Sequence, residues 1–253
     1  MKLLREIYLF YARKIKESSR NPAFLVMGIS TPILYLTLFA PLLKNFAVSM
    51  GAPSEGIYDM FVPGMLVMNA FFGGFFSGFG VIDELRGGVI ERFRVTPTSR
   101  FSILAGPVFH DLTAVIVLSV LFIGLAVPFG FHIHVTGLLS LFVLLALLLV
   151  TSSSFSHALG LITKSEDSLA PIVHGINLPI MLLSGMLLPI DFAPNWMKIV
   201  AHFNPVYYVV EAGRALAVGD FAKPIVTQAF CVMIPVAALT MTWATRIYRK
   251  AVM

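Results

Sequence analysis

The sequence is poor in charged residues and in cysteine. Asp, Glu, Lys and Arg make up 12% of the 253 residues, whereas a soluble domain carries about 25%. Hydrophobic residues make up 58%, so the composition excludes an ordinary soluble protein and indicates a polytopic membrane protein. Cys231, the single cysteine, lies in an apolar run and cannot form an intrachain disulfide. The net charge of +5 does not indicate nucleic-acid binding, because the basic residues stand at segment ends rather than in one patch.

The sequence also lacks the short motifs of several enzyme classes. It contains no Walker A pattern, no H-E-x-x-H and no other zinc motif. We therefore expect no catalytic residue, no metal site and no cofactor in this chain, and no ATP hydrolysis of the P-loop kind. The N-terminal residues mix charged and apolar types and do not show the pattern of a secretory signal peptide.

Six apolar segments each approach the roughly 20 residues that a membrane-spanning helix needs. They cover residues 23–43, 60–82, 106–131, 135–163, 168–188 and 224–243. His132 and His134 occupy the tight turn between the third and fourth segments. The sequence thus predicts an all-α polytopic membrane protein, with one transmembrane domain over residues 1–253.

Residues 1–22 precede the first apolar segment and contain an amphipathic helix. Leu4, Tyr8 and Ile15 are among the apolar residues that recur at helical spacing, and basic residues lie largely opposite. Such a helix is expected to lie along the cytoplasmic membrane surface, with its basic side chains near anionic headgroups. A soluble helix that packs on another subunit would show the same pattern and remains the alternative.

The distribution of Lys and Arg orients the chain in the membrane. Most of the 18 such residues lie in the N-terminal arm, in the loops after the second and fourth segments, and at the C terminus. The opposite side has only Lys44, Lys198, Arg214 and Lys223. Because basic residues concentrate in cytoplasmic loops, we expect both termini in the cytoplasm and residues 189–223 outside.

The outer stretch of residues 189–223 is divided into short pieces by three prolines: Pro189, Pro194 and Pro205. Trp196 and the neighbouring tyrosines favour a membrane–water boundary. Because interrupted backbone cannot lie bare in hydrocarbon, this stretch must lie at the membrane interface or dip into the bilayer while packed against protein. We describe it as a re-entrant hairpin between the fifth and sixth spanning helices. Glu211 and Arg214 are three residues apart and can pair on a helix. We predict that this pair stabilises the hairpin and forms an outer gate.

The loop of residues 83–100, between the second and third segments, is the most charged part of the chain. Apolar residues form a helical stripe in it, and charged residues occupy the remainder. A short helix of this kind suits docking into another protein, although an ordinary positive-inside loop would explain the arginines alone. The residues predicted to dock are Glu84, Leu85, Arg86, Val89, Ile90, Arg92 and Phe93. The loop of residues 164–167 is a weaker candidate for a second contact.

The second segment contains Gly74 and Gly78 in a G-x-x-x-G pattern, which is typical of closely packed helices. Its phenylalanines belong either to the protein core or to an apolar route for an amphipathic substrate. Four ionisable residues lie near the membrane: His110, Asp111, His157 and His174. We expect them to make structural hydrogen bonds between helices, with a proton relay as the alternative.

Two motifs around the outer stretch together resemble the membrane subunits of type-2 ABC exporters, above all permeases of the daunorubicin-resistance and polysaccharide-export types. They read Leu183-Ser184-Gly185-Met186, Pro189-Ile190, Pro194, Trp196-Met197, and then Asn204-Pro205, Tyr208, Glu211 and Arg214. The resemblance implies that residues 83–100 form a coupling helix for a separate nucleotide-binding subunit that binds ATP-Mg. It also implies a substrate pathway between two permease copies, or between this chain and a related permease. The candidate pathway residues are Asn69, Phe72, Phe76, Met181, Ser184 and Met186.

The expected function is therefore that of the permease subunit of an ATP-driven exporter in the plasma or inner membrane. The expected cargo is an amphipathic drug, a lipid, a glycolipid or a polysaccharide. An ion-gradient-driven secondary transporter is the alternative, but the sequence shows no convincing internal repeat. An intramembrane enzyme is a further alternative, which the adjacent His110 and Asp111 support poorly because neighbouring side chains on a helix face different directions.

Overall fold

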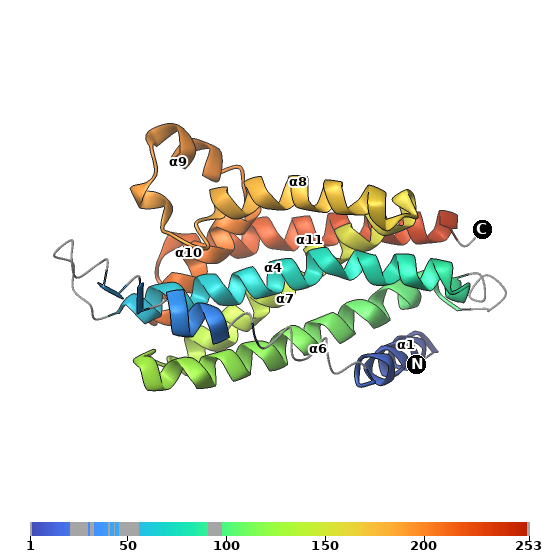
Figure 1. Cartoon of the computed structure of the whole chain (residues 1–253), viewed down its shortest axis with the longest axis horizontal. Helices are drawn as coiled ribbons and strands as arrows, with labels where there is room; N and C mark the ends of the chain where they lie inside the picture. The colour runs from blue at the N-terminus through green and yellow to red at the C-terminus, as the bar shows by residue number, and fades with distance from the viewer. Residues whose placement is uncertain are drawn as a thin grey trace.

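The structure is a computed structural model that describes residues 2–20, 30, 33–39, 41–42, 44–45, 56–90 and 98–251. Within these ranges every regular element is a helix, which confirms the all-α class. The long helices are α4 (Ile57–Arg86), α6 (Arg100–Ala126), α7 (Val135–Thr163), α8 (Glu166–Ser184) and α11 (Pro224–Ala251). They run roughly side by side along the long axis of the molecule (Figure 1). The shorter elements are α1 (Lys2–Ser18), η1 (Tyr35–Phe39), η2 (Val127–Phe129), η3 (Ile190–Phe192), α9 (Asn195–Ala201) and α10 (Pro205–Ala217).

Four helices of the described part are long and apolar enough to cross a membrane. They cover Tyr58–Arg86, Arg100–Phe129, Val135–Thr163 and Pro224–Lys250. On the second of these, Val117 and Val120 are more than half exposed, as expected of side chains that face lipid. The predicted first segment, residues 23–43, lies largely outside the described residues. Helix α8 carries Glu166 and Asp167 in its first turn and is not among the four, so six crossings stay a prediction.

The closest helix packing joins α4 to α7. A Cβ atom on Gly78 would overlap the backbone oxygen and the hydroxyl of Ser156, and one on Gly74 would overlap the Ser152 side chain. Across this contact the Gly78 amide donates a hydrogen bond of 3.1 Å to Ser156 Oγ, and the Ser156 hydroxyl donates to the Phe75 carbonyl. The two glycines thus let two spanning helices approach until the Ser156 side chain of α7 hydrogen-bonds with the backbone of α4.

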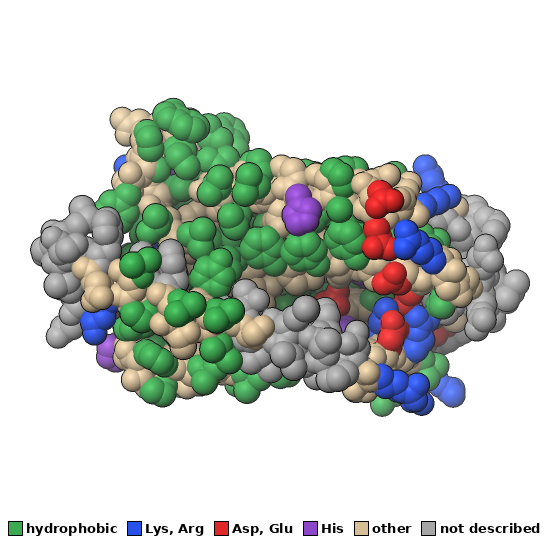
Figure 2. Space-filling view, in the orientation of Figure 1, with side chains coloured by type: hydrophobic (Ala, Val, Ile, Leu, Met, Phe, Trp, Pro, Cys, Tyr) green, Lys and Arg blue, Asp and Glu red, His purple; other side chains and the backbone are tan. Residues whose placement is uncertain are grey.

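The two ends of the bundle differ in composition. Helix α1, the C terminus and the start of α6 lie at one end, which we call the charged end, whereas α9 and α10 lie at the opposite end (Figure 1). On the face shown in Figure 2, most of the acidic and basic side chains gather at the charged end, and hydrophobic side chains cover the middle. This banding is the pattern expected of a protein with an apolar belt in lipid.

Helix α1 packs against α6 at the charged end and turns an apolar face outward. A Cβ atom on Gly106 of α6 would overlap Phe10, so the two helices are in close contact. Leu4 is 72% exposed and Tyr8 65% exposed, and both belong to the predicted apolar stripe. Since these two side chains face away from the protein, the structure leaves this part of the stripe able to contact the membrane surface.

At the opposite end, prolines divide residues 189–217 into the pieces η3, α9 and α10. Pro189 and Pro194 immediately precede η3 and α9, and Pro205 is the first residue of α10. Asn204 joins these pieces to the bundle, because its Oδ1 accepts a hydrogen bond from Val206 N (3.0 Å) while its Nδ2 donates to Ile180 O on α8 (2.8 Å). The re-entrant course expected of this stretch stays a prediction.

Candidate functional site

At the charged end, α1 holds both flanks of the connection between α4 and α6. Glu84, near the end of α4, is 8% exposed and pairs with Arg13 (2.5 Å) and Lys14 (2.9 Å). Before the start of α6, the Ser99 amide donates a hydrogen bond of 2.9 Å to Glu6 Oε2, and the Ser102 hydroxyl donates one of 3.2 Å to the same oxygen. Helix α1 is therefore attached to the connection by two separate polar contacts.

Lys14 is partly buried and lies beside two carboxylates, on Glu84 and Glu17, which affect its ionisation in the opposite sense to burial. Burial disfavours the charged ammonium and would by itself lower the pKa of Lys14, but the Glu84 and Glu17 carboxylates together outweigh burial and raise the pKa above its usual value of 10.5. Lys14 is thus a cation throughout the physiological pH range, and it points toward Glu84 rather than toward membrane headgroups.

The predicted docking residues fall into two groups. Arg86 is exposed and forms an ion pair with Glu166 of α8. This pair brings the loop of residues 164–167 beside the end of α4, so the two predicted contact loops share one surface. Ile90 is 2% exposed within an apolar cluster that includes Tyr248 of α11. Leu85 and Val89 are half-buried, while Arg92 and Phe93 lie outside the described residues.

Three of the predicted pathway residues lie on one face of α4. Asn69, Phe72 and Phe76 follow one another at helical spacing. Asn69 and Phe72 are half-buried, and Phe76 is exposed. The stack continues with Phe79: the ring centroids of Phe72 and Phe76 are 6.0 Å apart, and those of Phe76 and Phe79 are 6.1 Å apart. His174 of α8 contacts Phe76 edge-on at 5.9 Å. This aromatic ladder, Phe72–Phe76–Phe79, runs along α4 toward the charged end.

The remaining pathway candidates lie at the opposite end of α8 and are largely buried. The Ser184 hydroxyl donates to Met181 O (2.7 Å) and accepts from Met186 N (3.3 Å), which closes the turn after α8. Met186 is 1% exposed, and its carbonyl lies against Gly64 of α4. The structure therefore does not bring these residues together with the aromatic ladder, and their contact with substrate stays a prediction.

The ionisable residues of α6 and α7 form hydrogen bonds between helices. Asp111 accepts from the Ser153 hydroxyl of α7 at 3.0 Å and lies 3.1 Å from Nδ1 of His110. His157 Nδ1 lies 3.3 Å from the Tyr248 hydroxyl of α11. Structural bonding between helices, the simpler of the two interpretations, thus accounts for the contacts of Asp111 and His157. His110 instead contacts its neighbour Asp111 within α6, although adjacent side chains on a helix are expected to face different directions.

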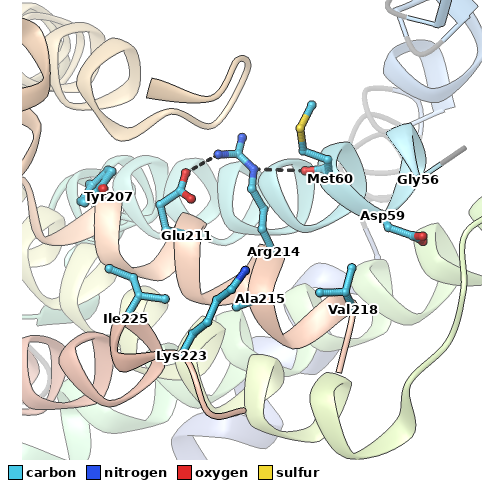
Figure 3. A pocket seen from close by; sticks show the side chains of 10 residues that line it. All are labelled: Gly56, Asp59, Met60, Tyr207, Glu211, Arg214, Ala215, Val218, Lys223 and Ile225. Atoms are coloured by element: carbon cyan, nitrogen blue, oxygen red, sulfur yellow. Dashed lines mark hydrogen bonds and ion pairs between the residues drawn. The ribbon is translucent and has the colours of Figure 1, made fainter. Parts of the chain in front are cut away.

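The pair predicted as an outer gate lies in a three-way contact at the α10 end. Arg214 Nη1 lies 2.5 Å from Glu211 Oε1, its Nε donates to Met60 O of α4 (3.2 Å), and its Nη2 donates to Gly185 O after α8 (2.5 Å). The two side chains point toward each other in a cavity of about 410 Å³ (Figure 3). Burial, together with the Glu211 charge, raises the pKa of Tyr207 beside them.

A second polar contact at this end has no signal in the sequence. Asp59 of α4 accepts from the backbone amide of His132 (2.9 Å), and its other oxygen lies 2.9 Å from Nδ1 of the same histidine. Nearby, His134 Nδ1 lies 2.9 Å from Ala217 O of α10. The tight turn between α6 and α7 is thus fixed to the starts and ends of other helices by its two histidines.

Comparison with known proteins assigns the chain to a family. Residues 5–218 match the family model described as ABC-2 type transporter, so the chain belongs to that family. It is 30% identical over 219 residues to the ycf38 transport permease of Cyanophora paradoxa, covering 84% of this chain and 74% of that protein. It is 28% identical over 215 residues to ycf38 of Porphyra purpurea, covering 84% and 74%. It is 22% identical over 231 residues to the daunorubicin resistance ABC transporter permease protein DrrB1 of Streptomyces coeruleorubidus, covering 90% and 81%.

Proposed function

We propose that this chain is the permease subunit of an ATP-driven exporter that moves an amphipathic drug, lipid, glycolipid or polysaccharide outward. Family membership over residues 5–218 carries the proposal. In it, the chain has no catalytic role, and ATP-Mg is bound and hydrolysed by separate nucleotide-binding subunits. Two permease copies, or this chain and a related permease, form the pathway with two such ATPase subunits.

The distribution of charge supports a contact with the ATPase at the charged end. Arg86 and Glu166 join the ends of two helices there, and α1 braces the adjoining connection through Glu84 and Glu6. Because α1 fixes this connection, movement of a docked partner would displace α4 and α6 together. Both chain termini lie at this same end (Figure 1), as expected if they share the cytoplasm with the ATPase.

The first experiment asks whether the chain needs nucleotide. The protein is reconstituted in vesicles with and without its ATPase partner, and efflux of a fluorescent amphiphile is followed. The proposal predicts transport only with the ATPase and ATP. Transport by the permease alone, driven by a proton or sodium gradient, would establish the secondary-transporter alternative instead.

The second experiment tests the docking surface with a charge swap. Arg86→Glu and Glu166→Arg each break the ion pair, whereas the double variant restores it with reversed polarity. If Arg86 contacts the ATPase, the double variant stays deficient in ATPase stimulation although its internal pair is repaired. Full recovery in the double variant would show that Arg86 acts only through Glu166. Lys223→Glu, at the α10 end, is the control that should leave stimulation unchanged.

Glu84 is also a predicted docking residue, but it is a poorer choice for such a test than Arg86. Reversing its charge would place a cation between Arg13 and Lys14 and detach α1, whether or not a partner docks nearby. A coupling defect in that variant would therefore report the brace rather than the docking surface.

A further inference from the structure

A second cavity, of about 320 Å³, lies at the charged end between α1, α4, α6 and α7. Its described lining contains four carboxylates, on Glu17, Asp83, Glu84 and Asp111, and one cation, on Lys14. Arg13 and Lys14 balance Glu84. The cavity therefore keeps an excess of negative charge. Glu17 and Asp83 are exposed, whereas Glu84 and Asp111 are largely buried, where charge is less screened.

The carboxylates of the cavity differ in the hydrogen-bond and ion-pair partners that they have inside the protein. Within the described residues the Asp83 carboxylate makes no ion pair or hydrogen bond. Asp111 is held by the Ser153 hydroxyl and by His110, both neutral partners when the histidine is uncharged. Neither Asp83 nor Asp111 has a lysine or arginine within ion-pair distance in the described part of the chain. A cation that enters the cavity would meet two carboxylates that have no basic partner among the described residues.

Two buried histidines in the lining have ring nitrogens available to a ligand. His157 is 2% exposed and His110 is 9% exposed, and both border the cavity. Each uses Nδ1 for a contact inside the protein, with Tyr248 and Asp111 respectively. Their Nε2 atoms have no hydrogen-bond partner among the described residues. Where Nδ1 of neutral His110 donates to Asp111, its Nε2 is an acceptor, which suits an N–H donor.

The aromatic ladder opens into the same cavity. Phe76 and Phe79 are lining residues, and Phe76 is 41% exposed although most of α4 is buried. Aromatic faces attract cations and also accept the apolar body of an amphiphile. The cavity and the ladder thus form one continuous surface that is acidic at one end and aromatic along α4.

We propose that this cavity binds the protonated amine of a cationic amphiphile, whose apolar body lies on the Phe72–Phe76–Phe79 ladder. Asp83 and Asp111 supply the countercharge, and Nε2 of His110 accepts a hydrogen bond from the amine. The proposal rests on the proposed export function and narrows its substrate class to amphiphiles that carry an ammonium group. An anionic or neutral lipid would leave the two carboxylates without a partner.

The test uses monodansylcadaverine, a fluorescent amine, and its N-acetyl derivative, which has the same body without the charge. Dansyl fluorescence is titrated with the full chain in phosphatidylcholine nanodiscs, and empty nanodiscs are subtracted. We expect the amine to bind about tenfold more tightly than the acetylated probe. Equal affinity for the two probes would overturn the proposal without any mutation being needed.

Variants then locate the site. Asp83→Asn with Asp111→Asn should weaken amine binding by about tenfold or more while leaving the acetylated probe unaffected. Phe76→Leu should weaken both probes by about two- to fivefold. Asp191→Asn and Phe221→Leu, at the α10 end, are the matched controls. Wild-type amine affinity in the Asp83/Asp111 double variant would refute the assignment. Because no ATPase or nucleotide is present, that result would leave the export function standing.

Discussion

The contact between α4 and α7 gives the sharpest prediction, because two glycines on one helix differ in their surroundings. A Cβ atom on Gly78 would overlap the Ser156 backbone, which cannot rotate away, whereas one on Gly80 would meet nothing within 4 Å. We therefore expect Gly78→Ala to destabilise the protein and Gly80→Ala to leave it unchanged or slightly more stable.

The magnitude follows from three contributions at Gly78. Overpacking a close contact costs about 1–3 kcal/mol, and weakening the hydrogen bond from the Gly78 amide to Ser156 Oγ costs about 1 kcal/mol. Alanine in place of glycine stabilises the protein by about 1 kcal/mol at either position, because it restricts the unfolded chain and favours the helix. The net loss for Gly78→Ala is then about 1–3 kcal/mol, and the two variants should differ by about 2–4 kcal/mol.

The assay is reversible unfolding in mixed micelles by SDS titration, followed by circular dichroism. Gly78→Ala should unfold at a clearly lower SDS fraction than wild type, and Gly80→Ala at the wild-type fraction or above it. Equal midpoints for the two variants would refute the close approach of α4 and α7.

Three further predictions concern polar contacts. Arg214→Ala removes two hydrogen bonds to backbone carbonyls, so it should lower the free energy of unfolding in SDS by about 2–4 kcal/mol. Lys223→Ala removes an exposed ion pair and should cost under about 1 kcal/mol. Equal losses in the two variants would contradict the three-way contact of Arg214. Because the pKa of Lys14 is raised in the folded protein, the stability that its charge contributes is fully present below pH 10.5 and is lost as the pH rises through the higher folded pKa. Glu84→Gln removes the charge that pairs with Arg13 and Lys14, so it should expose α1 to trypsin at neutral pH. Wild-type resistance in that variant would count against this attachment of α1. Asn204→Ala should cost about 1–2 kcal/mol through the lost helix cap and should speed proteolysis of the pieces at the α10 end, which an unchanged digestion pattern would disprove.

The features that the sequence predicts are those with a local pattern. Apolar segments separated by charged loops indicate an all-helical membrane protein, and the spacing of Gly74 and Gly78 indicates a close helix contact. The i, i+3 spacing of Glu211 and Arg214 indicates a pair, which the structure contains. In each case the residues lie in one segment, so their spacing along the sequence is enough to predict the feature.

Contacts between distant segments leave no such pattern. Arg13 and Glu84 are 71 residues apart, and nothing around either one distinguishes it from an ordinary charge at a membrane boundary. The same holds for Asp59 and His132, which are 73 residues apart. The sequence therefore predicts a partner contact at the charged end, but it does not reveal which charges there already form pairs inside the protein.

The attachment of α1 has a practical consequence for labelling the protein. Glu6, Arg13 and Lys14 all belong to the first helix, and together they hold the two margins of a segment that the proposed motor must push. A bulky fluorophore or affinity handle fused ahead of that helix would pull on those margins and could mimic a loss of energy coupling. Reporters are better placed after α11, because Arg249 and Lys250 near its end are exposed.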